Sequence, residues 1–335
     1  MKIAVVGAGV SGAYLLNRIP GEHQVECFER RPEDKWYTVC AWGTSEPFIK
    51  DMFKSAGFDF EKYVLHRGKK MTVDLGTEQF EIKLKGLVTY DKHALTHDMI
   101  EGHNMHWGSH VTEVDGNFSD FDIVVDATGL HRALLPKIEN DIVIPSLEYQ
   151  VKSKELPYDD FYIRPYSGLS GYYWFFPLGE GMGHIGAGDY FGKYRGELDD
   201  FVKKYHCEVI RKIGRPVRVS PPLYCQPFTS GKVVGVGESI GTVYPMLGEG
   251  IIPSMQCADI FVEHMDDMKG YSEAVLKKFA VYAKVFKFIK AKLDGNFSLA
   301  SYWPTLLSVF FYMKRNETRY GLQTKLMDLF RVLNA

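Results

Sequence analysis

The stretch KIAVVGAGVSG, Lys2 to Gly12, decides the fold of this 335-residue chain, because an apolar strand runs directly into a glycine-rich turn. In such a turn Gly7 permits the tight bend, Gly9 lets the backbone approach a pyrophosphate, and Gly12 lets the next helix pack on the strand. A second strand, QVECFE, ends in Glu29, where an acid can bind ribose hydroxyls. The segment predicts a Rossmann-type dinucleotide site and leaves NAD and FAD both open.

A second strand end of this kind follows in FDIVVDATG, Phe121 to Gly129. The strand closes on three residues with small side chains, which let the chain pass close to a cofactor. These are Ala127, Thr128 and Gly129. An ordinary buried parallel strand with its turn would read the same way.

A third strand end lies in the segment from Gly231 to Met265. Its strand finishes at Gly237 and Glu238, and a carboxylate there can accept hydrogen bonds from sugar-alcohol hydroxyls. A loop containing Gly248 and Gly250 leads into a helix from about Ile251, whose N-terminus would favour negative charge on a bound ligand. Three glycine-marked strand ends in one chain favour a cofactor site over three structural turns.

The motifs GxGxxG, DxxxxATG and G[D/E]xxGxxxPxxGxG, in this order, resemble those of the FAD-dependent monooxygenase-type flavoproteins, the p-hydroxybenzoate-hydroxylase-like superfamily. The resemblance implies FAD as the tightly bound cofactor. It also implies that all three strand ends contact FAD. Where this superfamily usually has Gly-Asp, the chain has Gly237-Glu238, which is one methylene longer.

An aromatic stretch, YYWFFPLGEGMGHIGAG, spans Tyr172 to Gly188. Its pattern YxWxFPx8GxG is similar to the signature of the geranylgeranyl reductase family. The matching residues are Tyr172, Trp174, Phe176, Pro177, Gly186 and Gly188, which the resemblance makes substrate-binding. The resemblance extends to TVCAWG, Thr38 to Gly43, and places Cys40 opposite the flavin. It implies an archaeal-type, FAD-dependent reductase of lipid biosynthesis, acting on geranylgeranyl diphosphate or a geranylgeranylated glycerol phospholipid.

The physics of this stretch is compatible with such a substrate. An isoprenoid chain offers almost no hydrogen bonds, so its site has to be elongated, dry and apolar. Because Tyr172, Trp174 and Phe176 alternate along a strand, they share one face, while Phe175 points the other way. From the residues alone, an ordinary aromatic core strand is an equal interpretation.

Reducing an isolated alkene requires a hydride at one carbon and a proton at the other, since no carbonyl polarises the bond. Cys40 is the candidate catalytic residue, either as an acid or as a packing residue. A hydroxylase or halogenase of the same fold, and a flavin- or lipid-binding protein without turnover, are the alternatives. A halogenase-type WxWxIP motif is absent from the sequence. The electron donor stays open among NADPH, ferredoxin and reduced quinone.

Composition restricts the partners. The net charge of −2 gives no bias toward nucleic acid, and five scattered cysteines without a CxxC motif favour a reducing compartment and argue against a disulfide framework or zinc site. No metal site is expected, because the five histidines between positions 93 and 110 follow no ligand spacing. We expect a cytoplasmic protein without signal peptide or membrane-spanning helix.

The sequence predicts an α/β fold with a discontinuous Rossmann-type FAD-binding domain, formed by residues 1–70, 92–135 and 226–268. Residues 71–91 and 136–225 are expected to form an antiparallel-sheet substrate domain, and residues 269–335 a helical region. Its stretch Ala274 to Leu293 has a helical pattern with six lysines and no acid. A solvated lysine face is the simpler interpretation, and peripheral contact with an anionic membrane is the alternative. Candidate anchors for a substrate phosphate are Lys50, Arg67, Lys69 and Lys70.

Overall fold

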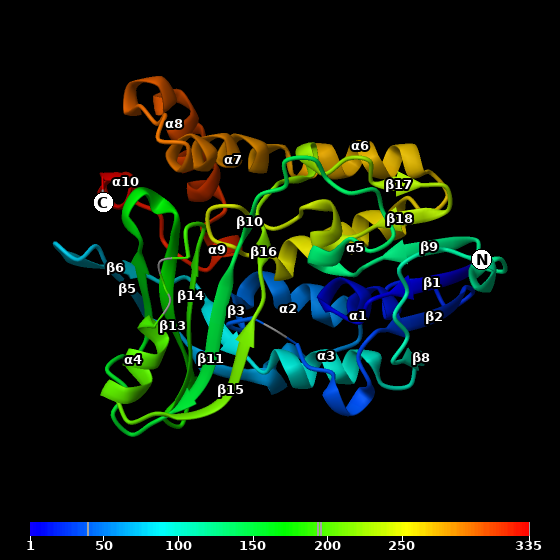
Figure 1. Ribbon diagram of the computed structural model, residues 1–335, viewed down its shortest axis with the longest axis horizontal. Helices are drawn as coiled ribbons and strands as arrows, with labels where there is room; N and C mark the ends of the chain where they lie inside the picture. Colours follow the sequence, from blue (N-terminus) through cyan, green and yellow to red (C-terminus); the bar gives the residue numbers. More distant parts are fainter. Residues whose placement is uncertain (39, 193, 195, 335) are drawn as a thin grey trace.

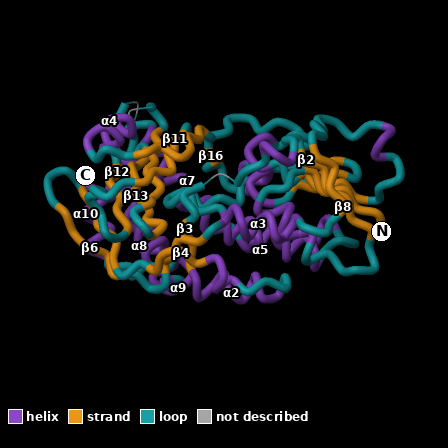
Figure 2. Tube along the Cα trace, turned by 90° about the horizontal axis from the view of Figure 1, so that it is seen from below, coloured by secondary structure: helices purple, strands orange, loops and turns teal. Residues whose placement is uncertain are grey.

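A computed structural model describes residues 1–38, 40–192, 194 and 196–334. The N-terminus lies beside a parallel sheet at one end of the molecule, and a second, mostly antiparallel sheet stands at the other end (Figure 1). The C-terminal helices run along one side and end next to the second sheet (Figure 1). The tube view shows the same separation of the two strand-rich ends, with helices between them (Figure 2).

The parallel sheet has six strands in the order β17-β18-β9-β1-β2-β8, and only β17 runs antiparallel to its neighbour among these described strands. Helix α1 packs against α3 and α5. The strands are β1 (Lys2–Val6), β2 (Gln24–Glu29), β8 (Asn104–Trp107), β9 (Ile123–Asp126), β17 (Thr229–Ser230) and β18 (Val233–Gly235). The helices are α1 (Val10–Leu16), α3 (Lys92–Ile100) and α5 (Ile251–Glu263). The α/β fold expected from the three strand ends is confirmed.

The second sheet has seven strands in the order β15-β11-β14-β13-β12-β5-β6. It is antiparallel except where β12 runs parallel to β5. One face packs on a hydrophobic core beneath α4 (Glu197–Lys204). The strands are β5 (Lys70–Asp74), β6 (Gln79–Lys83), β11 (Ser146–Lys152), β12 (Phe161–Pro165), β13 (Gly171–Gly179), β14 (Met182–Asp189) and β15 (Glu208–Gly214).

Two small sheets connect the larger ones. Strand β7 (Leu87–Tyr90) lies between β3 (Gly43–Ser45) and β4 (Val64–Arg67), and β10 (Val143–Ile144) pairs with β16 (Val217–Arg218). The expected substrate segment 71–91 is therefore divided. Strands β5 and β6 of this segment belong to the large sheet, whereas β7 pairs with β3 after a turn at Gly86, whose φ is +92°. Helix α2 (Glu46–Ser55) follows β3.

The C-terminal region is helical, with α6 (Met268–Lys278), α7 (Ala280–Leu293), α8 (Leu299–Arg315), α9 (Glu317–Tyr320) and α10 (Leu326–Asn334). The single helix expected over Ala274–Leu293 is interrupted at Phe279, a buried residue with φ −102° and ψ 16°. The interruption redirects the chain so that α7 turns its apolar side to the core. None of the described helices is long and apolar enough to cross a membrane.

Candidate functional site

One cavity of about 820 Å³ extends from the first glycine loop to the aromatic wall of the second sheet. The loop Gly7 to Ser11, Glu29 and Glu238 line one end of it, together with residues of all three predicted cofactor segments. Apolar side chains of the second sheet and of the C-terminal helices line the other end. The volume is in the upper part of the range for small-molecule sites.

The three glycines of the first loop have different surroundings. A Cβ on Gly7, whose φ is +104°, would lie 2.6 Å from the Ala127 carbonyl oxygen, so this glycine permits the turn against β9. A Cβ on Gly12 would overlap the Gly7 carbonyl oxygen and lie 3.0 Å from its carbon. A Cβ on Gly9 would meet nothing within 4 Å. Gly12 is therefore a packing glycine outside the cavity lining, and Gly9 presents its backbone to the open cavity.

Glu29 is held at the end of β2 by the loop itself. Its Oε2 accepts a hydrogen bond from Ala8 N at 3.0 Å, and its Oε1 accepts one from Arg31 N at 3.0 Å. The side chain is buried and lines the cavity. Two backbone donors fix the carboxylate where a ribose would approach it.

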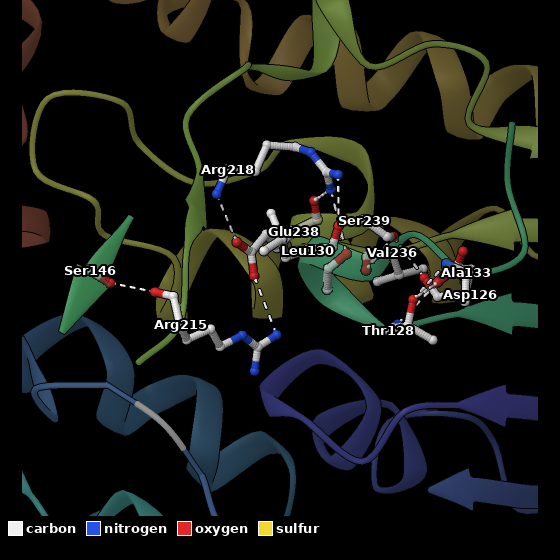
Figure 3. Close-up of polar contacts among 11 residues, drawn as sticks. Asp126, Thr128, Leu130, Ala133, Ser146, Arg215, Arg218, Val236, Glu238 and Ser239 are labelled. Atoms are coloured by element: carbon white, nitrogen blue, oxygen red, sulfur yellow. Dashed lines mark hydrogen bonds and ion pairs between the residues drawn. The ribbon is translucent and has the colours of Figure 1, made fainter. Parts of the chain in front are cut away.

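The turn after β9 is fixed by Asp126, a fully buried residue that the motif analysis did not single out (Figure 3). Its Oδ1 accepts from Thr128 N at 3.1 Å and from Thr128 Oγ1 at 2.6 Å, and its Oδ2 accepts from Leu134 N at 2.9 Å. As a result Ala127, Thr128 and Gly129 all line the cavity. Burying this acid is tolerated because its oxygens are satisfied by donors.

Glu238 faces the cavity beside two arginines of the β15–β16 region (Figure 3). Its Oε1 accepts from Arg218 N at 3.0 Å, and its Oε2 lies 3.8 Å from Arg215 Nη2. The Arg218 guanidinium donates to the carbonyl oxygens of Leu130 and Glu238, both at 2.8 Å, and joins the turns after β9 and β18. Gly129 has a φ of +63°, a backbone conformation that favours glycine, and a Cβ there would lie 2.9 Å from the flexible end of Arg215 at Nη2.

The neighbouring Gly237 does not line the cavity. Its φ of +78° and a would-be Cβ 2.8 Å from Ser11 Oγ make it a packing glycine between the first and third segments. The sequence analysis predicts a contact between Gly237 and the cofactor, whereas the structure gives Gly237 a packing role.

The third glycine loop brings Gly248, Gly250 and Ile251 to the cavity. Glu249 Oε1 accepts from Ile252 N at 3.0 Å in the first turn of α5, and Glu249 Oε2 pairs with Arg319 of α9 at 2.6 Å. This ion pair, whose arginine side chain is 8% exposed, ties the loop to the C-terminal region. The sequence analysis missed it, because its partners are 70 positions apart.

The aromatic wall is one face of β13 and its neighbours. Strand register pairs Tyr172 with Gly188, Trp174 with Gly186 and Phe176 with His184. Tyr172, Trp174, Phe176 and Gly188 line the cavity, whereas Pro177 and Gly186 do not. Met71, Val73 and Ile163 extend the apolar face.

Gly186 makes room for the Trp174 ring of the aromatic wall. A Cβ there would overlap the Trp174 ring and lie 2.7 Å from its Nε1, so the indole lies across the glycine. Gly43 has the same relation to Phe176, because its Cβ would overlap that ring and lie 2.8 Å from Cδ2. These glycines make room for aromatic rings rather than for a ligand.

The C-terminal helices close the apolar end of the cavity. Their contribution comes from α7, α8, α9, the segment between α9 and α10, and α10 itself. Of the run Tyr302 to Met313, Met313 is the lining residue among the described side chains. The lining set includes Phe288, Ile289, Met313, Tyr320, Leu322 and Leu329.

Cys40 lines the cavity with a φ of +147°, an unfavourable backbone conformation for a residue with a side chain. Its Sγ accepts from Trp42 N at 3.4 Å. Burial raises the pKa of the Cys40 thiol above its ordinary value, Lys92 opposes this, and Glu148 reinforces it. The thiol is therefore protonated at neutral pH. Val39, inside the same motif, lies outside the described residues.

The four basic residues proposed as phosphate anchors lie away from the cavity lining. Arg67 pairs with Glu46 at 2.7 Å and with Glu61 at 2.6 Å, and Lys70 pairs with Glu81 at 2.7 Å. Cationic side chains at the cavity are instead those of Lys92, Arg215 and Arg319, among others. Within the described ranges, no three His, Cys, Asp or Glu side chains are arranged to hold a metal ion.

Comparison with sequence collections gives limited information. No family model matches the chain. Over 207 residues the chain is 30% identical to an uncharacterised protein of Methanocaldococcus jannaschii, an alignment covering 53% of this chain and 55% of that protein. The chain thus spans about half the length of the curated relative it matches.

Similarity to solved structures covers almost the whole chain. A geranylgeranyl bacteriochlorophyll reductase-like protein from Thermoplasma acidophilum has a TM-score of 0.71 at 16% identity, covering 99% of this chain and 95% of that one. A flavoprotein/dehydrogenase from Cytophaga hutchinsonii has a TM-score of 0.65 at 14% identity, covering 94% and 89%. A probable FAD-dependent monooxygenase from Pseudomonas aeruginosa has a TM-score of 0.61 at 13% identity, covering 87% and 96%. The chain has the Rossmann-type fold of FAD-dependent flavoproteins, in agreement with the expected cofactor.

Proposed function

We propose that this protein is an FAD-dependent reductase that saturates isoprenoid double bonds of geranylgeranyl diphosphate or a geranylgeranylated glycerol phospholipid. The observation that carries the proposal is the continuity of the cavity. It joins a glycine-loop cradle with Glu29 and Glu238 to an apolar wall built around Tyr172, Trp174 and Phe176. A cofactor and a long apolar substrate would then share one enclosed space.

The residues of the cradle fit FAD. The open space at Gly9 would admit a pyrophosphate, and the fixed carboxylate of Glu29 would bind the adenosine ribose. Glu238 and Arg215 offer an acceptor and a donor for a hydroxylated chain. The backbone of Gly248, Gly250 and Ile251 would face the ring system. A fold with a complete set of these features is that of a flavin-binding protein.

Bound and reduced, FAD would supply a hydride for the alkene. The protein's own residues would orient the isoprenoid by shape, because the wall offers area and almost no hydrogen bonds. The C-terminal residues Phe288, Met313 and Leu329 would exclude water from the apolar end. Cys40 lines the same cavity, where the family resemblance leaves it as an acid or a packing residue, and burial raises the pKa of its thiol above the ordinary value.

The proposal also includes contact with a membrane surface, from which the protein would take up a lipid substrate. Lys284, Lys287 and Lys290 line a surface groove between α7 and α8, and Phe311 on α8 is 54% exposed. A groove lined by cations, with an exposed aromatic residue on one of the two helices that form it, fits an anionic bilayer surface. We expect the protein to float with anionic but not neutral liposomes, and Lys284→Glu with Lys287→Glu to abolish flotation. Lysine-independent flotation would contradict this part.

The function is tested by supplying the purified protein with FAD, dithionite and geranylgeranyl diphosphate under anaerobic conditions. Mass spectrometry is expected to show a product heavier by two hydrogens for each double bond reduced. The geranylgeranyl glycerolipid is assayed in parallel to identify the head group, and NADPH and ferredoxin are compared as electron donors. A flavin spectrum with both substrates unchanged would refute the reductase and direct attention to oxygen-dependent hydroxylation.

A further inference from the structure

A buried carboxylate–imidazole pair lies within the otherwise apolar sheet face of the cavity. Glu148 of β11 and His184 of β14 are bonded through Oε1 and Nδ1 at 2.7 Å. Glu148 is 6% exposed and His184 is 1% exposed. Glu148 lies outside the motifs that pointed to a flavin or to an aromatic wall, and His184 occupies an unspecified position within YxWxFPx8GxG.

Register places both side chains on the cavity side of the sheet. Glu148 pairs with Gly186, which pairs with Trp174, and His184 pairs with Phe176. Paired residues of antiparallel strands point to the same face, so the pair shares the face of the aromatic wall. The flanking side chains Tyr173 and Phe175 point into the opposite core.

Within this pair, Glu148 is the member that lines the cavity. His184 lies behind it, covered by the Trp42 ring with centroids 4.8 Å apart. The His184 Nε2 atom is buried and has no hydrogen-bond partner among the described residues. Burying two ionisable groups carries a desolvation penalty that an apolar pair would avoid. A buried titratable pair that reaches a ligand cavity is therefore a candidate for a chemical use.

Reduction of an unactivated alkene requires a proton donor, which such a pair could provide. The hydrogen bond of the Cys40 thiol is with the backbone N–H of Trp42, which cannot return a proton to a spent thiolate. Glu148 by contrast contacts a second proton-carrying group directly. Together Glu148 and His184 can store one transferable proton, either as carboxylic acid beside imidazole or as carboxylate beside imidazolium.

We propose that Glu148 is the proton donor for alkene reduction and that His184 restores its proton. The inference rests on the proposed function. Reduced FAD, when bound, would supply a hydride, and thus two electrons, to one alkene carbon. The other carbon forms a C–H bond as the Glu148 O–H bond breaks, which leaves a carboxylate. Proton transfer from His184 returns Glu148 to the acid, and water that enters the cavity between turnovers resupplies the proton to the pair through Glu148, the member that lines the cavity.

The test compares Glu148→Gln, His184→Gln and Cys40→Ala with the wild-type holoprotein. The matched control is Glu81→Gln, which neutralises an exposed carboxylate, 58% accessible, on strand β6 of the same sheet. Flavin reoxidation by geranylgeranyl diphosphate is followed in a single anaerobic turnover and over many turnovers. FAD affinity and the rate of flavin reduction by dithionite are measured separately.

Glu148→Gln is expected to slow the single turnover at least about 100-fold, in line with the loss of a general acid, with FAD affinity unchanged. His184→Gln is expected to leave the first turnover nearly intact and to slow later ones, which a purely structural role would not do. The control is expected within about threefold of wild type, and a single turnover slowed more by Cys40→Ala than by Glu148→Gln would overturn the inference. Rates within about threefold of each other are counted as equal, because substitutions away from a site often have small effects of this size.

Wild-type rates in Glu148→Gln would overturn the inference while leaving the reductase intact. If Glu148→Gln does not fold, His184→Gln carries the test, and a wild-type rate over many turnovers in that variant would overturn the inference. A wild-type protein that reduces no prenyl substrate would remove the proposed function and this inference with it. The two failures are therefore distinguishable.

Discussion

Replacing Gly9 and Gly12 by alanine separates cofactor approach from packing in the first loop. A Cβ on Gly12 would overlap a backbone oxygen of Gly7, which cannot rotate away as a side chain does. Overpacking of this kind typically costs about 1–3 kcal/mol. A Cβ on Gly9 meets no protein atom within 4 Å, and its φ of −76° is accessible to any residue.

For Gly9→Ala we therefore expect a loss of only about 0.5 kcal/mol in the unfolding free energy of the apoprotein, since alanine is a poorer N-cap than glycine. Its added methyl group would occupy the space in which a pyrophosphate approaches the backbone. We expect the FAD dissociation constant to rise at least about tenfold, which corresponds to about 1.4 kcal/mol.

Urea denaturation of the apoproteins measures the first quantity, and a flavin fluorescence titration measures the second. Gly12→Ala should lose stability in the apoprotein, and Gly9→Ala should lose FAD affinity with near wild-type stability. Wild-type FAD affinity in Gly9→Ala would refute the assignment of this space to the cofactor. A stable Gly12→Ala apoprotein would refute the packing argument.

Three further predictions concern the wall, the thiol and the C-terminal region. Gly186→Ala should displace Trp174 and lower the unfolding free energy by about 1–3 kcal/mol, whereas Gly188→Ala, whose Cβ would lie 3.3 Å from Ser146 Cβ, should cost less; equal melting temperatures of the two variants would contradict this. Iodoacetamide should alkylate Cys40 slowly at pH 7 and faster only well above the ordinary thiol pKa of about 8.5, because burial raises its pKa; mass spectrometry showing rapid modification at pH 7 would refute it. Although burial alone would raise it, hydrogen bonds from Lys314 and Lys85 lower the pKa of Glu317 from 4.5 to about 2. The Glu317 carboxylate should therefore stabilise the fold above about pH 4.5, and this contribution should disappear as the pH falls toward 2. Acid unfolding is monitored by circular dichroism, and the same dependence on pH in wild type and Glu317→Gln would contradict the prediction.

The cofactor cradle was predictable because its logic is local. Gly7, Gly9, Gly12 and Glu29 are close in sequence, and strand, turn and acid follow one another as the fold requires. The alternation of Tyr172, Trp174 and Phe176 likewise predicted which face they share, and the register of β13 with β14 agrees with it.

Features that depend on distant residues escaped the sequence analysis. The position of Glu238 depends on Arg215 and Arg218, and the Gly248–Ile251 loop is tied to α9 through Glu249 and Arg319, which no local pattern indicates. The interruption of the lysine-rich helix at Phe279 also has a tertiary cause, since that residue is buried in the main core. His184, by contrast, could have been singled out from the sequence, because it is a histidine among the glycines of YxWxFPx8GxG.

The most direct test of the central claim, that one cavity holds a reduced flavin beside an isoprenoid, is an anaerobic single-turnover measurement. Dithionite-reduced holoprotein is mixed with geranylgeranyl diphosphate, or with the geranylgeranyl glycerolipid, and the flavin absorbance is followed. We predict reoxidation without oxygen, with one double bond saturated for each flavin oxidised. A flavin that stays reduced with both substrates and reoxidises only when oxygen is admitted would contradict the account.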